Sequence, residues 1–527
     1  MASTRCVRLG SKLAILALFV AFLSATTLRA DQLEDLRKTA QRHEANGDYG
    51  KACSYYAAIL AKDRTLTEIK QRFHLCLRHF HRGRRHQDET YRNHVLKQDP
   101  KIALKVYAEL VRQVHGEYHE ESRVGYQRLF RQGLEEFKLS LEDARFRQLY
   151  LPNASAEAVA RFTRRLQHDW RDQLITDLVD LEQPVLQVAL AAKKDLGVQM
   201  TVTVLELACG ACNALDEHTC YVPPKQYEED FGSLRGQTAG VGIELAAVED
   251  ELIVTQVVIN SPASRAGVIA GDRLVRVDRQ PVEHMPLDEI HAKLRGKPGT
   301  TIQLDIVTGM SEPRTFTLVR LPIQASVTDY RIADMDAGVG YVQISCFHEN
   351  TLAELEDAIT QLEMQGMKVL ILDLRGNYGG LVESARLVAE KFLWEGALIY
   401  STKGRDQRPV KMHSRNVAPS RTPLVVLVDG TTASAAEILA GALKDNSRAT
   451  LVGENTFGKG TVQQMLAVKT IRAGGIRFTY AKVYSPENRT YNESGVSPHV
   501  FIERNSFSDE QNNEARLIAR QIAGMAR

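Results

Sequence analysis

The sequence carries almost no net charge, because 67 basic residues balance 65 acidic ones to a formal sum of +2. A protein without a strong field of one sign has little electrostatic means of attracting nucleic acid or an anionic membrane. Low-complexity tracts are also lacking, and the contents of hydrophobic residues (44%) and charged residues (25%) are ordinary for globular proteins. The composition therefore argues against long disorder, a multi-span membrane protein and a nucleic-acid partner.

Long apolar runs are scarce, and the first thirty residues contain the run that matters for targeting. Residues Leu13 to Leu23 are apolar, follow a basic start and lead through small residues to Ala30. This pattern predicts a signal peptide over residues 1–30, since the run is short for a transmembrane helix. An uncleaved leader would instead act as a membrane anchor. We expect an exported protein, periplasmic or otherwise extracytoplasmic.

Cysteine is sparse, and removal of Cys6 with the leader would leave six thiols in an oxidising compartment. Their pairing is not deducible from the sequence, and they are Cys53, Cys76, Cys209, Cys212, Cys220 and Cys346. The C-x-x-C spacing of Cys209 and Cys212 occurs in redox and zinc sites, but no second such pair completes a zinc set. We interpret these two as buried thiols or a local disulfide, and we expect neither a metal nor an organic cofactor.

The chain of 527 residues is longer than one hydrophobic core supports, so several domains are expected. Residues 31–195 have helical spacing with few Gly or Pro residues, which predicts an α-helical domain. Within it, residues 46–60 resemble one tetratricopeptide unit, for which an ordinary helical hairpin is the alternative because one repeat cannot bury its faces alone. The domain is a candidate dock for an adaptor or for self-association.

The sequence pattern changes twice in the rest of the chain. Residues 234–322 are short alternating strands separated by Gly, Pro and Asp turns, which predicts a β-rich domain. Residues 323–505 alternate apolar strand-like runs with helical segments, which predicts an α/β core. We assign the helical or linker segment 196–233 to this core, and residues 506–527 to a C-terminal helix without evident chemistry.

A candidate nucleophile lies where an apolar strand-like run, residues 424–428, gives way to a helix. Ser434 falls at the start of that helix, where unpaired N–H groups and the helix dipole favour a developing oxyanion. The amide of Ala435 is well placed to donate to such an oxyanion. Because Ser is also a favoured N-cap, this feature alone favours capping over catalysis.

Lys459 changes this balance, since it follows Ser434 by twenty-five residues and lies among small and apolar neighbours. Burial disfavours an ammonium group, so a buried Lys459 can be neutral near physiological pH and accept the proton of the Ser hydroxyl. Gln463 lies four residues further on, a spacing that places both side chains on one face of a helix or strand. Its amide is a candidate for orienting the amine.

These segments resemble the C-terminal processing peptidases, or tail-specific proteases, whose nucleophile segment reads Ser-Ala-Ser-Ala-Ser-Glu-Ile. Residues 432–438 read Thr-Ala-Ser-Ala-Ala-Glu-Ile, and residues 457–463 read Phe-Gly-Lys-Gly-Thr-Val-Gln. The resemblance implies that Ser434 is the nucleophile, Lys459 the general base and Gln463 the third catalytic residue.

A third segment, residues 372–380, is similar to the strand and loop of this family in which Asn precedes Pro-Gly-Gly. The resemblance implies that Gly380 and Ala435 supply the two donors of an oxyanion hole. Tyr378 replaces the usual Pro, and a simple Gly turn is the alternative for this segment taken alone. Asp445 falls at a position implicated in activity in some members.

The β-rich domain resembles a PDZ module, which binds protein tails by strand addition. The resemblance implies that the terminal carboxylate of a tail is received by backbone amides of Gly240, Val241, Gly242 and Ile243. Residues 261–272 resemble the middle of the module, and Arg295 is a candidate contact to the catalytic domain. The implied partners are proteins with flexible, apolar C-termini.

The resemblance covers residues 205–503 but not the helical N-terminal region, and together with the predictions from sequence pattern it indicates a multidomain protein. Its parts are an α-helical N-terminal domain, a β-rich PDZ domain and an α/β peptidase core of the crotonase/ClpP-like kind. We interpret His218 as structural, because a Ser/Lys mechanism needs no His and this residue has no evident partner in the sequence.

The predicted function is a cofactor-free serine endopeptidase that cleaves exported proteins at or near unstructured C-terminal tails. One alternative is a catalytically silent PDZ scaffold that binds tails, against which the presence of Ser434, Lys459 and Gln463 argues. The other is a binder of small lipophilic ligands on the same core fold, which would not need these three residues.

Overall fold

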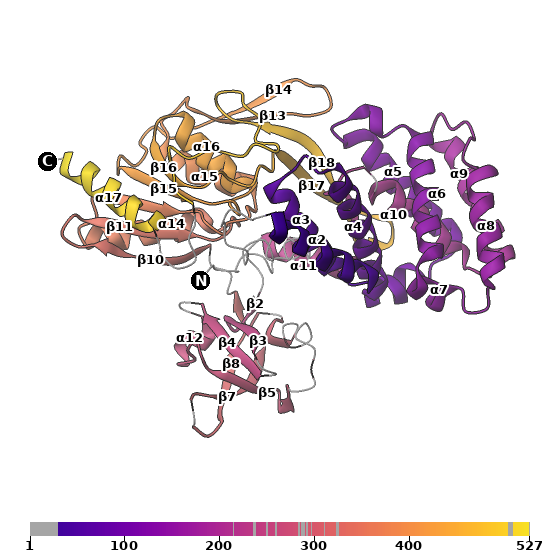
Figure 1. Ribbon diagram of the computed structural model, residues 1–527, viewed down its shortest axis with the longest axis horizontal. Coiled ribbons are helices and arrows are strands. Elements are labelled where there is room, and N and C mark those ends of the chain that lie inside the picture. The colour runs from indigo at the N-terminus through magenta and orange to yellow at the C-terminus, as the bar shows by residue number, and fades with distance from the viewer. Residues whose placement is uncertain are drawn as a thin grey trace.

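The computed structural model describes residues 30–525, apart from 214, 235–238, 249–250, 259–260, 283–284, 286–289, 291–292, 297, 310, 323–325 and 504–509. The predicted signal peptide lies outside these residues except for its last position. Figure 1 shows a helical region, a larger α/β part beside it and a small β-rich lobe. Within the described part of the chain, no helix has the length and hydropathy needed to cross a membrane.

The N-terminal region is helical, as the sequence predicts. Its helices are α2 (Ala30–Ala45), α3 (Tyr49–Lys62), α4 (Thr67–Gln87), α5 (Pro100–Glu117), α6 (Tyr126–Glu142), α7 (Ala144–Tyr150), α8 (Ala156–His168), α9 (Leu178–Leu196) and α10 (Met200–Asn213). Local signals set several boundaries. Asp99 caps α5, which has Pro100 in its first turn, and Gly197 ends α9 with a φ of 75°.

The first three helices, α2 to α4, form a unit that we call the N-terminal arm (residues 30–87). The tetratricopeptide-like stretch forms the turn and the second helix of the hairpin of α2 and α3, and this turn has Gly47 at a φ of 75°. The hairpin packs against α4 through a small core of its own, which comprises Leu36, Ala40, Ala52, Cys53, Tyr56, Ile59, Ile69, Phe73, Cys76 and Leu77.

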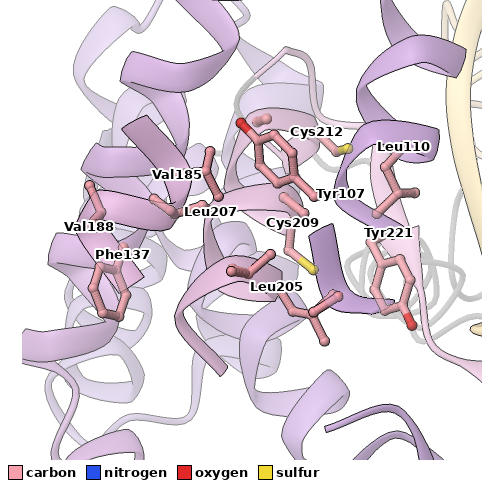
Figure 2. Packing of buried hydrophobic residues seen from close by; sticks show 14 of the residues in the cluster. Tyr107, Leu110, Phe137, Val185, Val188, Leu205, Leu207, Cys209, Cys212 and Tyr221 are labelled. Atoms are coloured by element: carbon pink, nitrogen blue, oxygen red, sulfur yellow. The ribbon is translucent and has the colours of Figure 1, made fainter. Parts of the chain in front are cut away.

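Helix α10 lies at the centre of the helical core, and its residues 201–213 are all buried. Figure 2 shows Cys209 and Cys212 among these apolar side chains, and both thiols are free. Burial raises the pKa of Cys209 to about 12. The sequence left buried thiols and a local disulfide as alternatives for these two residues, and the structure has buried thiols. The same core contains Phe478 of the α/β part, so α10 joins the two parts.

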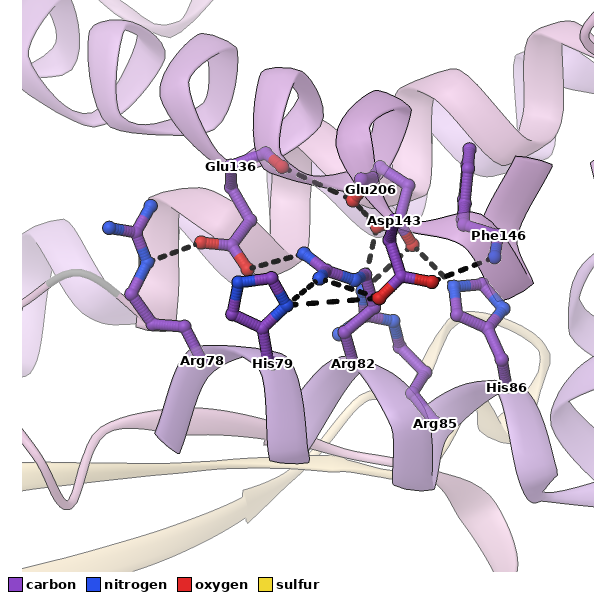
Figure 3. A network of polar contacts seen from close by, with 10 residues as sticks. Arg78, His79, Arg82, Arg85, His86, Glu136, Asp143, Phe146 and Glu206 are labelled. Carbon is purple, nitrogen blue, oxygen red and sulfur yellow. Dashed lines mark hydrogen bonds and ion pairs between the residues drawn. The ribbon is translucent and has the colours of Figure 1, made fainter. Parts of the chain in front are cut away.

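A network of buried ion pairs fixes the second half of α4 to its neighbours (Figure 3). Arg78 donates to Glu136 of α6 at 2.6 Å, and Arg85 donates to Glu206 of α10 at 2.7 and 2.9 Å. His86 also contacts Glu206, at 3.0 Å. Burial alone would raise the pKa of Glu206, but the charges of Arg85 and His86 outweigh it and hold that pKa well below its usual value.

Glu206→Ala should lower the free energy of unfolding by about 3–5 kcal/mol, because it leaves the guanidinium of Arg85 buried and unpaired. Chemical denaturation followed by circular dichroism measures this change. Glu68→Ala is the matched control, since Glu68 pairs with Arg37 at 2.9 Å on the surface and its loss should cost less than about 1 kcal/mol. Equal losses in the two variants would contradict the assigned role of the network.

The β-rich domain is an antiparallel sheet with the strand order β3-β4-β5-β7-β8. Its elements are β2 (Ala239–Gly240), β3 (Ile243–Val248), β4 (Glu251–Val257), α12 (Pro262–Arg265), β5 (Arg273–Val277), β6 (Gln280–Pro281), β7 (Thr301–Val307), β8 (Arg314–Val319) and β9 (Leu321–Pro322). Short β2 pairs with β9, where the chain enters and leaves the domain. Among the described residues, β3 has no strand on its outer side and is an edge of the sheet.

The α/β part is built on a six-stranded sheet in the order β10-β11-β12-β15-β16-β19. These strands are β10 (Val327–Asp334), β11 (Val339–Ile344), β12 (Val369–Asp373), β15 (Leu424–Val428), β16 (Ala449–Gly453) and β19 (Val500–Phe501). All pairs except β10 with β11 are parallel. Residues of β12 and β15 are buried throughout, which explains their continuous apolar sequence.

A second sheet and several helices complete the described α/β part. The sheet contains β1 (Cys220–Val222), β13 (Leu398–Lys403), β14 (Pro409–His413), β17 (Thr461–Ala467) and β18 (Gly475–Tyr484). The helices are α14 (Thr351–Met364), α15 (Val382–Phe392), α16 (Ala435–Asp445) and α17 (Glu510–Met525), and a further helix, α11 (Pro224–Leu234), follows β1. Helix α17 packs against strands of the six-stranded sheet through alanines, of which Ala515 and Ala519 are fully buried. The predicted fold class is confirmed.

Candidate active site

Ser434 lies in a sharp turn between the carboxyl end of β15 and helix α16. Its backbone has a φ of 58° and a ψ of −119°, which is a strained conformation for a residue with a side chain and costs about 1–3 kcal/mol. Buried Asp429 orders the turn, because it accepts the N–H groups of Thr431 and Thr432, each at 3.0 Å. The turn leaves Ser434 partly exposed, while its neighbours in the chain are buried.

The carboxylate of Glu437 connects this turn to the loop that carries Lys459. It accepts the N–H of Ser434 at 2.7 Å, the hydroxyl of Thr456 at 2.6 Å, and the N–H groups of Gly458 and Lys459 at 2.6 and 2.8 Å. The side chain is fully buried, and burial raises its pKa although these hydrogen bonds act in the opposite direction. One side chain therefore fixes the backbone on both sides of the candidate site.

Sequence reasoning did not single out Glu437. The available signal was its position three residues after Ser434, which is the spacing of a capping box. The spacing accounts for the bond to Ser434, but the bonds to the Lys459 loop depend on tertiary structure.

Lys459 lies in the loop between β16 and β17, and its side chain is half-buried. Its pKa is lowered from 10.5 to about 8, first by burial and then by the positive charge of Arg477. The carboxylates of Glu217 and Glu437 act in the opposite direction. The amine therefore loses its proton more easily than an exposed lysine does.

Gln463 lies on β17, but the structure does not join it to Lys459. Its amide donates to the hydroxyls of Thr461 at 2.9 Å and Thr479 at 3.3 Å, and no hydrogen bond to Lys459 exists among the described residues. The prediction of a shared face assumed one regular element. Lys459 instead precedes the strand, and the register shifts between Val462 and Gln463.

The glycine loop after β12 lies against the Ser434 turn. A Cβ atom built on Gly379 would be 2.8 Å from the Cβ of Ser434 and 3.0 Å from the nitrogen of Ala435. Gly379 and Gly380 have φ values of 100° and 138°, which side chains rarely allow. Both contact and conformation therefore require glycine here.

The N–H groups of Gly380 and Ala435 have no acceptor among the described residues. In the parallel bridge to Phe347, the bonds are made by the N–H of Leu381 at 2.9 Å and the carbonyl of Gly379 at 3.0 Å. The N–H of Gly380 therefore points away from that bridge. The N–H of Ala435 is the first of α16, where intrahelical acceptors are lacking.

Asn377, rather than a proline, anchors the loop in which Tyr378 replaces the usual residue. Fully buried, it accepts the N–H of Gly379 at 2.8 Å and donates to the carbonyl of Ile344 at 2.9 Å. Its own carbonyl accepts the N–H of Ala433 at 2.9 Å. The glycine loop and the Ser434 turn are thus hydrogen-bonded to each other.

His218 has a partner that the sequence did not make evident. Its Nε2 atom lies 3.3 Å from an oxygen of Glu217, and its pKa is lowered to about 4, mainly by burial and then by the charge of Lys459. The segment 216–218 is therefore part of the electrostatic surroundings of Lys459. The sequence separation of these residues from Lys459 explains why no local pattern indicated this.

Of the two remaining candidates, Asp445 lies away from the Ser434 turn. Asp445 is at the opposite end of α16 from Ser434, about 15 Å along the helix, and pairs with Arg489 at 2.6 Å. Arg295 belongs to the β-rich domain, next to the bridge between Gly296 and Ala239. Its predicted contact to the catalytic domain stays a prediction.

A strained serine beside free N–H donors, on an α/β core joined to a β-rich domain, defines the general class of serine hydrolases. Residues 338–502 match peptidase family S41, and residues 253–308 match the PDZ domain. The predicted β-rich domain is therefore a PDZ domain.

Comparison with similar proteins identifies the family more specifically. The carboxyl-terminal-processing protease of Synechocystis sp. is 36% identical over 55% of this chain and 69% of that protein. The corresponding protein of Bartonella bacilliformis is 32% identical over 56% of this chain and 68% of its own. Among solved structures, the photosystem II D1 C-terminal processing protease aligns with a TM-score of 0.41 and 24% identity, over 79% of this chain and 97% of that one.

The chain belongs to the carboxyl-terminal processing proteases, a family of S41 serine peptidases. It is an enzyme that acts on proteins, as the sequence predicts. Membership of this family favours the enzyme over the silent scaffold and the lipophilic-ligand binder.

Proposed function

We propose that the protein is a Ser/Lys endopeptidase that cleaves exported proteins at or near flexible, apolar C-terminal tails. Ser434 is the nucleophile, Lys459 is the general base, and Gly380 and Ala435 donate to the oxyanion. The observation that carries this proposal is the carboxylate of Glu437, which binds the backbone N–H of both Ser434 and Lys459. Export is proposed from the sequence of the leader alone.

The reaction begins when the neutral amine of Lys459 takes the hydroxyl proton of Ser434 as its oxygen attacks the carbonyl carbon of the peptide bond. The resulting oxyanion accepts hydrogen bonds from the N–H groups of Gly380 and Ala435. When the C–N bond breaks, the ammonium of Lys459 gives its proton to the leaving amine. An ester between Ser434 and the substrate remains.

Water completes the cycle by attacking the ester carbonyl and giving a proton to Lys459. The ester C–O bond then breaks, Ser434 regains its proton from Lys459, and a carboxylic acid leaves. Gln463 contacts Thr461 and Thr479 in the free enzyme, so we assign it a supporting role in ordering β17 beside Lys459.

The PDZ domain supplies the substrate site. Its edge strand β3 can accept an extended tail, and the loop 240–243 before it is the proposed receptor for the terminal carboxylate. Gly242 in this loop has a φ of 81°, and an added Cβ would lie 2.1 Å from the Cβ of Ser261. The loop therefore has the glycine-dependent geometry that close approach to a carboxylate needs.

A peptide with a free, apolar C-terminus should be cleaved with a kcat/KM about tenfold higher than its amidated or charged-terminus forms. An amide leaves the carboxylate site unmatched, and a buried unpaired charge is costly. Steady-state kinetics on three peptides that differ only at the terminus measure the effect.

Gly242→Ala should remove this preference, because its Cβ overlaps Ser261. Gly267→Ala is the matched control, since Gly267 also has a positive φ, 85°, but faces open space. Equal kcat/KM for all three peptides with the unmodified enzyme would refute tail selection by the PDZ domain.

A further inference from the structure

The N-terminal arm reaches the loop of Lys459, although it lies nearly 400 residues earlier in the chain. Among the described residues, three side chains of the arm make polar contacts with the α/β part, and each contact falls on a segment near Lys459. Arg64, at the corner between α3 and α4, makes the most direct one.

The guanidinium of Arg64 donates to the backbone carbonyls of Phe457 and Gly458, the latter at 3.4 Å. Its central carbon also lies 5.0 Å from the centre of the Phe457 ring, within the range of a cation–π contact. These are the two residues immediately before Lys459. A planar group with several donors can hold two successive carbonyls in one orientation.

Glu437 binds the N–H groups of the same loop. It accepts the N–H groups of Gly458 and Lys459, whereas Arg64 donates to the carbonyls of Phe457 and Gly458. The peptide units that lead into Lys459 are thus fixed at both ends of their dipoles. Glu437 is part of the peptidase core, but Arg64 comes from a region outside the matches to the peptidase and PDZ families.

The other two contacts of the arm reinforce this position. Lys70 pairs with Glu493 at 3.1 Å, and the N–H of Glu493 donates to the carbonyl of Gly458 at 2.9 Å. His74 lies 3.4 Å from Glu217, whose charge acts on Lys459. These side chains are between 40% and 57% exposed, so each pair contributes little by itself.

The arm is therefore fixed by buried ion pairs at one end, its base, and by a few exposed contacts at the other end, its tip. Its base is the second half of α4, which the buried ion pairs of Figure 3 fix to α6 and α10. Its tip is the corner at Arg64, which ends on the Lys459 loop. Such an arrangement positions the loop without embedding it in a core.

We propose that Arg64 is a positioning residue of the peptidase and that the N-terminal arm completes the active site by holding the Lys459 loop in place. The helical region is then part of the catalytic apparatus as well as a candidate dock. This inference rests on the proposed role of Lys459 as the general base.

The test compares the full-length enzyme with its Arg64→Ala, Arg64→Lys and Arg37→Ala variants. Arg64→Ala should lower kcat on the order of 100-fold with KM within about twofold, because a misplaced base affects chemistry more than binding. Arg64→Lys keeps the charge and a donor group but not the planar fork, so its kcat should lie between those of the unmodified enzyme and Arg64→Ala. Arg37→Ala breaks an exposed pair in the same arm, and its kcat should match that of the unmodified enzyme.

Amide hydrogen exchange gives a readout that does not depend on activity. Exchange of residues 456–460 should become about tenfold faster in Arg64→Ala and remain unchanged in Arg37→Ala. Thermal unfolding reports whether each variant folds. If Arg64→Ala does not fold, the comparison is made with Arg64→Lys.

Two results would overturn the proposal. One is unchanged exchange and unchanged kcat in a folded Arg64→Ala protein. The other is an effect of Arg37→Ala that equals the effect of Arg64→Ala. Faster exchange in Arg64→Ala together with activity that survives Ser434→Ala would support the positioning by the arm and refute the proposed catalytic function instead.

Discussion

Ser434→Ala and Lys459→Ala are each expected to lower kcat by at least about 10³-fold, and the double variant should be no slower than the worse of the two. The two residues act as one unit, because an alkoxide cannot form without the amine and the amine has no task without the hydroxyl. Cleavage of a tailed protein substrate, followed over long incubation, measures the loss.

The control for this pair is Lys469→Ala, which removes an exposed lysine from the same segment of the chain. Its kcat should remain that of the unmodified enzyme. Circular dichroism and thermal unfolding should show that all variants fold. Full cleavage by either active-site variant would refute the assignment, as would losses that multiply in the double variant.

Glu437→Gln is expected to lower kcat on the order of 100-fold although Glu437 never touches the substrate. The carboxylate accepts four hydrogen bonds from groups on both sides of the site. An amide of the same shape turns an NH₂ group toward these donors, so at least one of them loses its acceptor. The Lys459 loop should then move relative to Ser434.

The matched control is Glu136→Gln, which changes another fully buried carboxylate. Glu136 pairs with Arg78 in the helical region, so its loss should lower stability. Because the Arg85–Glu206 pair still fixes α4, kcat per folded molecule should fall far less than in Glu437→Gln. A Glu437→Gln enzyme that loses stability but retains kcat would show that the carboxylate only supports folding.

The sequence predicts those parts of this protein whose signals are local. The apolar run 424–428 and the helix after it place Ser434 in a strand–turn–helix because both elements have clear periodicity. The β-rich domain is predicted from its Gly and Pro turns, and the helical region from its spacing, whereas the PDZ identity came from the family resemblance. Each of these features depends on residues that are close together in the chain.

The arrangement around Lys459 could not be predicted in the same way. Its neighbours Arg64, Glu217 and Glu437 come from three distant segments, and only the fold brings them together. The spacing of Lys459 and Gln463 predicted a shared face, but a register shift in β17 breaks the regular alternation of side chains. Helix α10, assigned from the sequence to the peptidase core, also lies at the centre of the helical region.

The most direct measurement of the central claim is the rate of acyl-enzyme formation on Ser434 as a function of pH. Acid quenching, digestion and mass spectrometry locate and count the acyl adduct after mixing with a peptide substrate. Because the pKa of Lys459 is lowered to about 8, the amine is protonated below that pH and available as a base above it. We predict an adduct on the peptide that contains Ser434, formed at a rate that rises with pH to a plateau with a midpoint near 8. An adduct on another residue, or a rate that does not change across this pH range, would contradict the Ser/Lys mechanism.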